Sequence, residues 1–209
     1  MFRLLCGAMI TFVITSVQAT AQDVRITPDM DTFSVTINGE VIEIGRIQDT
    51  SNRLTSEFAK TSRPCPPFCI HPISAAPGIA TIGEIEVLEF LTSHVSEGRG
   101  LLVDARVPEW FAKGTIPGAV NIPFPTLDET NPFRDEILKV LGAVDVGGSW
   151  NYDNALDLAL FCNGPWCDQS PRAIKALMAA GYPPEKLRYY RGGIQMWMLL
   201  GLSLNEPNS

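Results

Sequence analysis

Short, mainly apolar runs alternate with helically spaced apolar positions along the last two thirds of the chain. Such runs are typical of buried strands. They lie at residues 101–104, 119–122, 156–161 and 187–190. Helical patterns occupy residues 81–98, 108–113, 131–148 and 170–180, with a short one after Gly192-Gly193. This alternation predicts an α/β domain, in which helices cover both faces of a central parallel sheet.

Several residues predict where these helices begin and end. Thr81 and Glu84 have the spacing of a capping box, which places the N-cap at Thr81. Ser170 and Pro171 suit the N-cap and first position of a later helix, and Gly181 suits its C-cap. The pattern leaves the extent of the helix within residues 131–148 open.

Residues 22–80 are predicted to form an N-terminal extension ahead of a domain at residues 81–209. Apolar and polar residues alternate over residues 33–37 and 40–44, on either side of Asn38-Gly39. This pattern predicts a β-hairpin with a type I′ turn. A lone hairpin is marginal in water, so we expect it to pack on the main domain. Four prolines in residues 61–72 then predict a stiff loop.

The first 21 residues have the pattern of a signal peptide. A short positive start precedes an apolar run from Leu4 to Val17, and Ala19 and Ala21 have the spacing of a cleavage site. The run is short for a membrane anchor. We therefore expect cleavage after Ala21, a periplasmic or secreted mature protein, and no stable membrane insertion.

Composition and charge narrow the function. The chain has 45% hydrophobic and 19% charged residues, which is globular composition. Its net charge of -7 and lack of a basic cluster argue against nucleic acid as a partner. Export to an oxidising compartment permits disulfides. The mature chain keeps four cysteines, and their spacing favours pairing Cys65 with Cys69 and Cys162 with Cys167, if they pair.

From Ile82 to Leu204 the chain resembles the rhodanese homology domain. Four blocks agree in order and spacing: residues 102–106 (Leu-Val-Asp-Ala-Arg) with Glu109 and Phe111, residues 114–123 (Gly-Thr-Ile-Pro-Gly-Ala-Val-Asn-Ile-Pro), residues 160–162 (Leu-Phe-Cys), and residues 191–197 (Arg-Gly-Gly-x-x-x-Trp). The resemblance implies a rhodanese-like fold with Cys162 as the active-site cysteine. Members of the family often carry sulfane sulfur as a cysteine persulfide, whereas others have lost catalysis and act as binding modules. The resemblance also implies that Asp104 and Arg106 are structural, and that Thr115, where the family usually has His, is a structural difference.

The residues around Cys162 independently point to thiol chemistry. The cysteine follows a predicted buried strand and precedes the helix that begins near Ser170. Backbone N–H groups of residues 163–168, together with the helix N-terminus, can stabilise an anion there and lower the pKa of the thiol. We expect Asn163-Gly164 to form a tight turn, and Pro165 and Trp166 to stiffen the loop and form an apolar wall. The residues expected to contact the substrate are Asn163, Gly164, Pro165, Trp166, Asp168 and Arg172. The bland alternative is a buried, inert cysteine.

The loop also departs from the common pattern of sulfurtransferases. It looks longer, and residues 163–169 include no Arg or Lys. Asp168 puts a negative charge close to any anionic donor, and Arg172 is the nearest cation in sequence. We therefore expect thiosulfate to be a poor substrate. The related phosphatase chemistry is excluded, because position 168 is not the Arg that would clamp a phosphate.

Three further thiols leave alternatives open. Cys167 can be a relay or resolving thiol for Cys162, or can merely fill space. Cys65 and Cys69 can form a local disulfide, serve as a second redox pair, or bind a metal with His71, although three ligands fall short of a closed zinc site.

The leading hypothesis is therefore an exported sulfurtransferase without a cofactor or metal, acting on a small sulfur-containing substrate or a thiol acceptor. The alternatives are a periplasmic thiol–disulfide redox protein and a non-catalytic module that binds a partner protein.

Overall fold

The centre of the molecule is a five-stranded sheet in which every neighbouring pair is parallel. The computed structural model describes residues 24–207. The strand order is β3-β9-β8-β4-β5, with β8 in the middle. The bounds are β3 (Ala80–Ile82), β4 (Gly100–Asp104), β5 (Ala119–Asn121), β8 (Asp157–Phe161) and β9 (Leu187–Tyr190). The predicted α/β architecture is confirmed.

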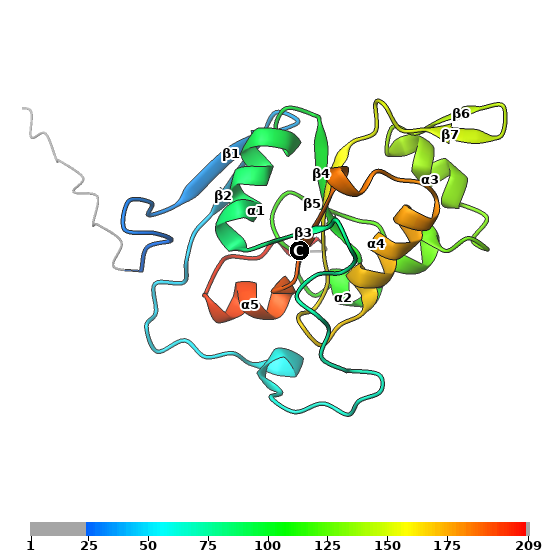
Figure 1. The fold of residues 1–209 in the computed structure, drawn as a ribbon. Helices are drawn as coiled ribbons and strands as arrows, with labels where there is room; N and C mark the ends of the chain where they lie inside the picture. The colour runs from blue at the N-terminus through cyan, green and yellow to red at the C-terminus, as the bar shows by residue number, and fades with distance from the viewer. Residues whose placement is uncertain (1–23, 208–209) are drawn as a thin grey trace, which may run out of the picture.

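Alternating side chains of the strands divide the core into two clusters. On β8, Leu158 and Leu160 enter one cluster, and Ala159 and Phe161 enter the other. The first cluster also contains residues of α3 (Arg134–Val140) and α4 (Gln169–Ala179). The second contains residues of α1 (Glu84–Phe90) and α5 (Gly193–Leu199). A short α2 (Pro108–Phe111) follows β4. Helices thus cover both faces of the sheet, as Figure 1 shows.

The predicted N-terminal hairpin is present and packs on the domain. It consists of β1 (Phe33–Ile37) and β2 (Glu40–Ile44), paired antiparallel. The turn residues Asn38 and Gly39 have φ of 51° and 86°, the conformation that a type I′ turn requires. Val35 and Ile44 are buried in the cluster beneath α1 and α5. This contact covers the apolar face of the hairpin, which would otherwise be exposed to water.

The predicted start of the first helix is wrong. Thr81 is not an N-cap, because it lies in β3, where its hydroxyl donates to the carbonyl of Ile73 at 2.6 Å. The helix begins at Glu84, and Glu86 accepts a hydrogen bond from the N–H of Gly83 at 2.9 Å. The capping box is therefore two residues later than predicted. Sequence spacing could not reveal this shift, because the pairing of β3 with β9 decides it.

The segment 131–148 contains more than the predicted helix. Helix α3 ends before Gly142, whose φ of +90° lies outside the range of a right-handed helix. An antiparallel hairpin follows, formed by β6 (Val144–Val146) and β7 (Ser149–Asn151). Strand β6 has only three residues, which is too short for apolar–polar alternation to predict a strand from the sequence.

A buried ion pair joins the end of β4 to two neighbouring loops. The Arg106 Nη2 lies 2.6 Å from Asp104 Oδ2, and both side chains are almost completely buried. Arg106 also donates to the carbonyl of Gly114 at 2.7 Å and to Asn163 Oδ1 at 3.4 Å. Thr115 donates its hydroxyl to Asp104 at 2.8 Å. These contacts support the expected structural roles of Asp104, Arg106 and Thr115.

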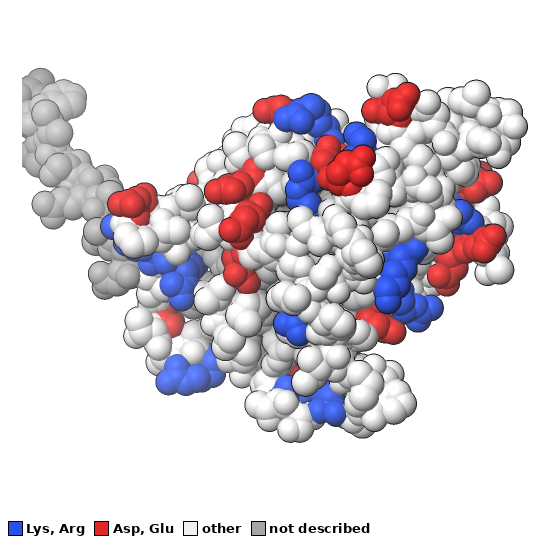
Figure 2. Space-filling view, viewed as in Figure 1, with Lys and Arg blue, Asp and Glu red and all other residues white. Residues whose placement is uncertain are grey.

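The surface and the N-terminus add two observations. Acidic and basic side chains are intermixed on the face seen in Figure 2. Within residues 24–207, no helix has the length and apolarity needed to cross a membrane. The predicted signal peptide at residues 1–21 lies outside the described residues.

We predict that Arg106→Met destabilises the protein by about 3–5 kcal/mol, because it leaves the Asp104 carboxylate buried without its partner. Urea unfolding of the oxidised mature protein measures this loss. Arg99→Met is the control, because Arg99 pairs with Glu97 at the surface and its loss should change little. A loss below about 1 kcal/mol for Arg106→Met would show that the buried pair does not organise the fold.

Candidate active site

Cys162 lies at the centre of the sheet's carboxyl edge. It directly follows Phe161, the last residue of β8, which is paired with β4 on one side and β9 on the other. The loop 162–168, hereafter the Cys162 loop, leads into α4. Ligands of open parallel sheets bind at this edge. Both Cys162 and Cys167 are free thiols, and only 2% and 5% of their surfaces are exposed.

Hydrogen-bond donors converge on the sulfur of Cys162. The Ser170 hydroxyl lies 3.1 Å from Cys162 Sγ, and the backbone N–H groups of Gly164 and Ser170 also point to it. Ser170 is therefore not the predicted N-cap: α4 begins at Gln169 after Asp168, and Ser170 lies in the first turn. The backbone N–H groups of residues 163–168 were predicted to surround the sulfur. That of Gly164 points to it, and that of Ser170, outside the predicted range, does so as well.

The pKa values of the two thiols are shifted in opposite directions. Burial disfavours the thiolate of Cys162, but hydrogen bonds from the Cys167 thiol, from the hydroxyl and N–H of Ser170 and from the N–H of Gly164 outweigh burial and lower its pKa. Burial raises the pKa of Cys167 well above its ordinary value, and the neighbouring Cys162 thiolate raises it further. The pair is therefore arranged so that Cys162 ionises first and Cys167 stays protonated.

Helix α5 holds the backbone of the Cys162 loop. The N–H groups of Ile194 and Gln195 donate to the carbonyls of Cys162 and Asn163 at 3.0 and 2.9 Å. Gly193 permits this approach: its φ is +57°, and a Cβ there would stand 2.3 Å from the carbonyl oxygen of Cys162. Gly193 thus allows the start of α5 to pack directly against the Cys162 loop.

Asn163 is a positioning residue in this structure. Its amide oxygen accepts from Arg106, and its amide nitrogen lies 3.8 Å from Cys167 Sγ. Only 2% of the residue is exposed. It therefore connects the buried ion pair to the second thiol.

Part of the N-terminal extension lies against the Cys162 loop. We call residues 53–72 the strap. The N–H of His71 donates to the carbonyl of Pro165 at 3.0 Å. Phe68 meets Trp166 edge to face, with ring centroids 5.6 Å apart, and the Arg63 guanidinium lies 3.7 Å from the centre of the Trp166 ring. The strap is thus stacked on the wall that Trp166 was predicted to form.

Side chains after β9 fasten both ends of the strap. Gln195 donates to the carbonyl of Phe58 at 2.8 Å and accepts from the indole N–H of Trp166 at 2.6 Å. Arg191 donates to the carbonyls of His71 and Pro72 at 2.8 and 3.1 Å. The segment that leads from β9 into α5 therefore holds both the strap and the Cys162 loop.

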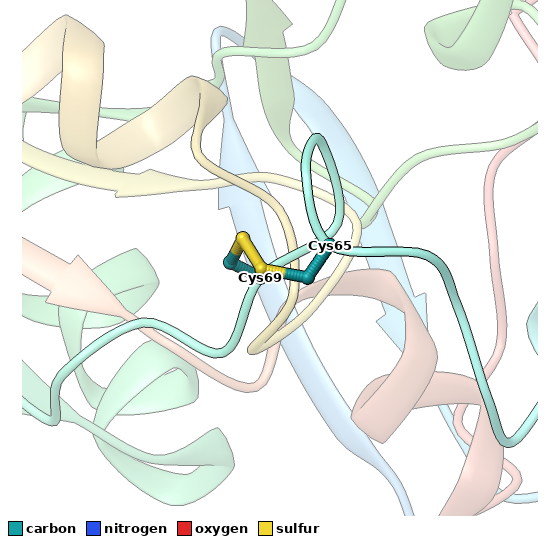
Figure 3. Close-up of a disulfide and its surroundings, with 2 residues drawn as sticks. All are labelled: Cys65 and Cys69. Carbon is teal, nitrogen blue, oxygen red and sulfur yellow. A yellow bond between two sulfur atoms is a disulfide. The ribbon is translucent and has the colours of Figure 1, made fainter.

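Cys65 and Cys69 form a disulfide that closes a tight loop within the strap (Figure 3). Their Cα atoms are 4.6 Å apart. The predicted local disulfide is confirmed, and the metal alternative with His71 is wrong for this state because both sulfurs are bonded. Within residues 24–207, His, Cys, Asp and Glu side chains form no group of three that could hold a metal ion.

Arg172, an expected substrate contact, has its closest partners outside the Cys162 loop. Its guanidinium lies over the Phe124 ring at 4.2 Å and 4.0 Å from the carboxylate of Asp128. The cation stacked on the Cys162 loop is instead Arg63 of the strap. Asp168 precedes α4 at its N-cap position, without a side-chain capping bond.

Sequence reasoning therefore missed Ser170 and Arg63. The hydroxyl of Ser170 could have been recognised from its position two residues after the Cys162 loop, in the first turn of the helix. Arg63 carried no such signal, because its contact depends on how the extension folds back.

The family comparison agrees with this geometry. The model of the family described as Rhodanese-like domain matches residues 88–200. The chain belongs to the rhodanese-like family. Its matched region contains Cys162, Cys167, Ser170 and the buried ion pair, whereas the strap precedes it.

Individual relatives of this rhodanese-like protein are distant. HTH-type transcriptional regulator Rv0324 of Mycobacterium tuberculosis is 29% identical over 109 residues, which cover 52% of this chain and 39% of that protein. The match therefore spans well under half of that relative. Among solved structures, human single-domain sulfurtransferase TSTD1 is 26% identical with a TM-score of 0.39, covering 57% of this chain and 95% of that one. Saccharomyces cerevisiae single-domain sulfurtransferase RDL2 is 21% identical with a TM-score of 0.42, covering 59% and 91%.

We predict that Ser170→Ala raises the pKa of Cys162, because it removes a hydrogen bond that favours the thiolate. At neutral pH the fraction of thiolate falls, so alkylation by iodoacetamide should slow several-fold and its pH profile should move to higher pH. Ser74→Ala, which removes a hydroxyl bonded to the carbonyl of Ala76, is the control. An unchanged profile for Ser170→Ala would mean that its hydroxyl does not stabilise the thiolate.

We also predict that the Cys65→Ser/Cys69→Ser double variant exposes Cys162. Opening this short loop should cost about 2 kcal/mol of stability through the entropy of the unfolded chain, and should loosen Phe68 from Trp166. Iodoacetamide should then alkylate Cys162 several-fold faster at fixed pH. Phe68→Ala, which keeps the disulfide, should accelerate alkylation in the same direction. Equal rates in all three proteins would show that the strap does not control access.

Proposed function

We propose that this rhodanese-like protein is an exported sulfurtransferase that carries sulfane sulfur as a persulfide on Cys162. The observation that carries the proposal is the set of donors around Cys162 Sγ, made up of the Ser170 hydroxyl and the N–H groups of Gly164 and Ser170. Donors that stabilise a thiolate can also stabilise the terminal anionic sulfur of a persulfide. Persulfide chemistry is also frequent in the family.

The reaction needs two transfers of one sulfur atom. The Cys162 thiolate attacks the sulfane sulfur of the donor, forming a sulfur–sulfur bond while the rest of the donor leaves with the electron pair. An acceptor thiolate then attacks the outer sulfur, and Cys162 leaves as the thiolate. Alternatively, Cys167 loses its proton and attacks the inner sulfur, which forms the Cys162–Cys167 disulfide and releases hydrosulfide. The electrons balance in each step, and no cofactor is required.

The proposed donors are polysulfides or low-molecular-weight persulfides rather than thiosulfate. Residues 163–169 include no cation, and Asp168 adds a carboxylate to the loop. Arg172 lies beside Phe124 and Asp128. Thiosulfate would bring two negative charges to this loop, whereas a singly protonated polysulfide would bring one.

A second candidate function is thiol–disulfide exchange by Cys162 and Cys167. The hydrogen bond between the two thiols and their opposite pKa shifts favour it. Cys162 would attack a partner disulfide, and Cys167 would resolve the mixed disulfide, so that two electrons pass to the partner.

The proposal also includes export, with residues 1–21 as a cleaved leader, 22–80 as an extension and 81–209 as the rhodanese-like domain. The Cys65–Cys69 disulfide supports an oxidising compartment such as the periplasm or the exterior. The partner would be a small sulfur compound or a thiol acceptor, including a protein thiol.

We predict that reduced mature protein gains the mass of one sulfur atom on the Cys162 peptide after treatment with a polysulfide, and far less after thiosulfate. Intact mass and peptide mapping measure the addition. Cys162→Ser should abolish it, whereas Cys167→Ser should retain it and make it longer-lived, because the resolving thiol is absent.

The control is Cys162→Ser with Cys167 intact, which reports sulfur bound elsewhere. Absence of added sulfur, together with rapid formation of the Cys162–Cys167 disulfide by a protein disulfide, would reject sulfur transfer in favour of dithiol exchange.

A further inference from the structure

A groove of about 840 Å³ separates the strap from the Cys162 loop and α5. Its size is that of a pocket for an organic molecule. Three segments that are distant in sequence form its walls: residues 53–70 of the strap, Pro165 and Trp166 of the Cys162 loop, and Gln195, Met196 and Leu199 around α5.

Much of the groove is apolar. Phe58 and Phe68 contribute aromatic rings from the strap, and Trp166 of the Cys162 loop meets Phe68 edge to face. Met196 and Leu199 add aliphatic surface from α5. Such walls suit the apolar body of a ligand.

The charges in the lining have one sign. Arg53, Lys60 and Arg63 line the groove, and among the described residues none of its lining side chains is acidic. This is unusual for a chain whose net charge is -7. The neighbouring Glu57 pairs with Lys60 at 2.7 Å and lies 3.9 Å from Arg63, so it offsets one of the three positive charges. In the lower part of Figure 2, where the strap lies in Figure 1, basic atoms stand among uncharged ones.

Arg63 provides an independent indication of a ligand. Its side chain is only 8% exposed, and its guanidinium is held between the rings of Trp166 at 3.7 Å and Phe68 at 5.5 Å. One nitrogen donates to the carbonyl of Glu57. The buried Nε, however, has no hydrogen-bond partner among residues 24–207. A buried donor left unpaired is costly, and an anionic acceptor would relieve that cost.

We propose that this groove binds an organic acid, with its carboxylate or sulfonate at Arg63 and its apolar body against Phe58, Trp166 and Leu199. Lys60 and Arg53 stand at the rim and attract the same charge. Neither Cys162 nor Cys167 lines the groove, although Pro165 and Trp166 of the Cys162 loop do. A bound acid touches the strap and the Cys162 loop together and so holds them in contact.

The test uses two fluorescent probes with the same apolar body on the oxidised, mature protein. Anilinonaphthalene sulfonate carries the acidic group, and phenylnaphthylamine is its neutral counterpart. We expect the sulfonate to bind at one saturable site, and the neutral probe to bind about tenfold more weakly, which is the contribution of one charge-assisted contact. Equal affinities would overturn the proposal, since an apolar surface alone would then explain binding.

Variants locate the site. Arg63→Met should weaken binding of the sulfonate about tenfold. Arg134→Met, at a separate surface hollow with Arg172 and Lys175, should leave it unchanged. Because Arg63 also stacks on Trp166, Lys60→Gln and Arg53→Gln serve as variants that keep this stack, each weakening binding about threefold. Wild-type affinity in all three groove variants would overturn the proposal, as would equal loss in Arg134→Met.

The outcome is independent of sulfur transfer. Cys162→Ser abolishes the proposed persulfide but should bind the sulfonate with wild-type affinity. The organic-acid site and the sulfurtransferase function can thus fail or succeed separately.

Discussion

The buried ion pair of Asp104 and Arg106 is the constraint on which the site depends. Removing two charges from water is costly, and the cost is recovered only when every partner is in place. Arg106 meets Asp104, the carbonyl of Gly114 and the amide of Asn163, so the end of β4, the following turn and the start of the Cys162 loop must adopt one arrangement. Polar contacts therefore add to strand pairing and apolar packing in holding the chain where it leaves β8.

The chemistry of Cys162 results from two opposing effects in the same place. A central strand end is buried, and burial alone would keep a thiol protonated. Donors from Ser170, Gly164 and Cys167 reverse that effect for Cys162, whereas Cys167 retains it. A difference in local hydrogen bonding thus distinguishes a thiol that ionises more readily from a protonated thiol only five residues later in the chain.

The extension is part of the site rather than an appendage. Its hairpin completes the core beneath α1 and α5, and its strap rests on Trp166 and Pro165. The strap brings Arg63 to a loop that has no cation of its own in residues 163–169. One segment, which the disulfide between Cys65 and Cys69 restrains, therefore both covers Trp166 of the Cys162 loop and lines the neighbouring groove.

The sequence by itself determined the features that depend on neighbours along the chain. Apolar runs identified four of the five sheet strands, Asn38-Gly39 identified the hairpin, and the spacing of Cys65 and Cys69 allowed their disulfide. The motif around Cys162 located the candidate nucleophile because strand, cysteine and helix follow one another directly. Only the tertiary structure decided that Ser170 faces the sulfur, that Arg172 lies beside Asp128 and that Arg63 stacks on Trp166. These contacts depend on side-chain direction and on a strap that returns across the chain from about a hundred residues away, and local periodicity contains no information about either.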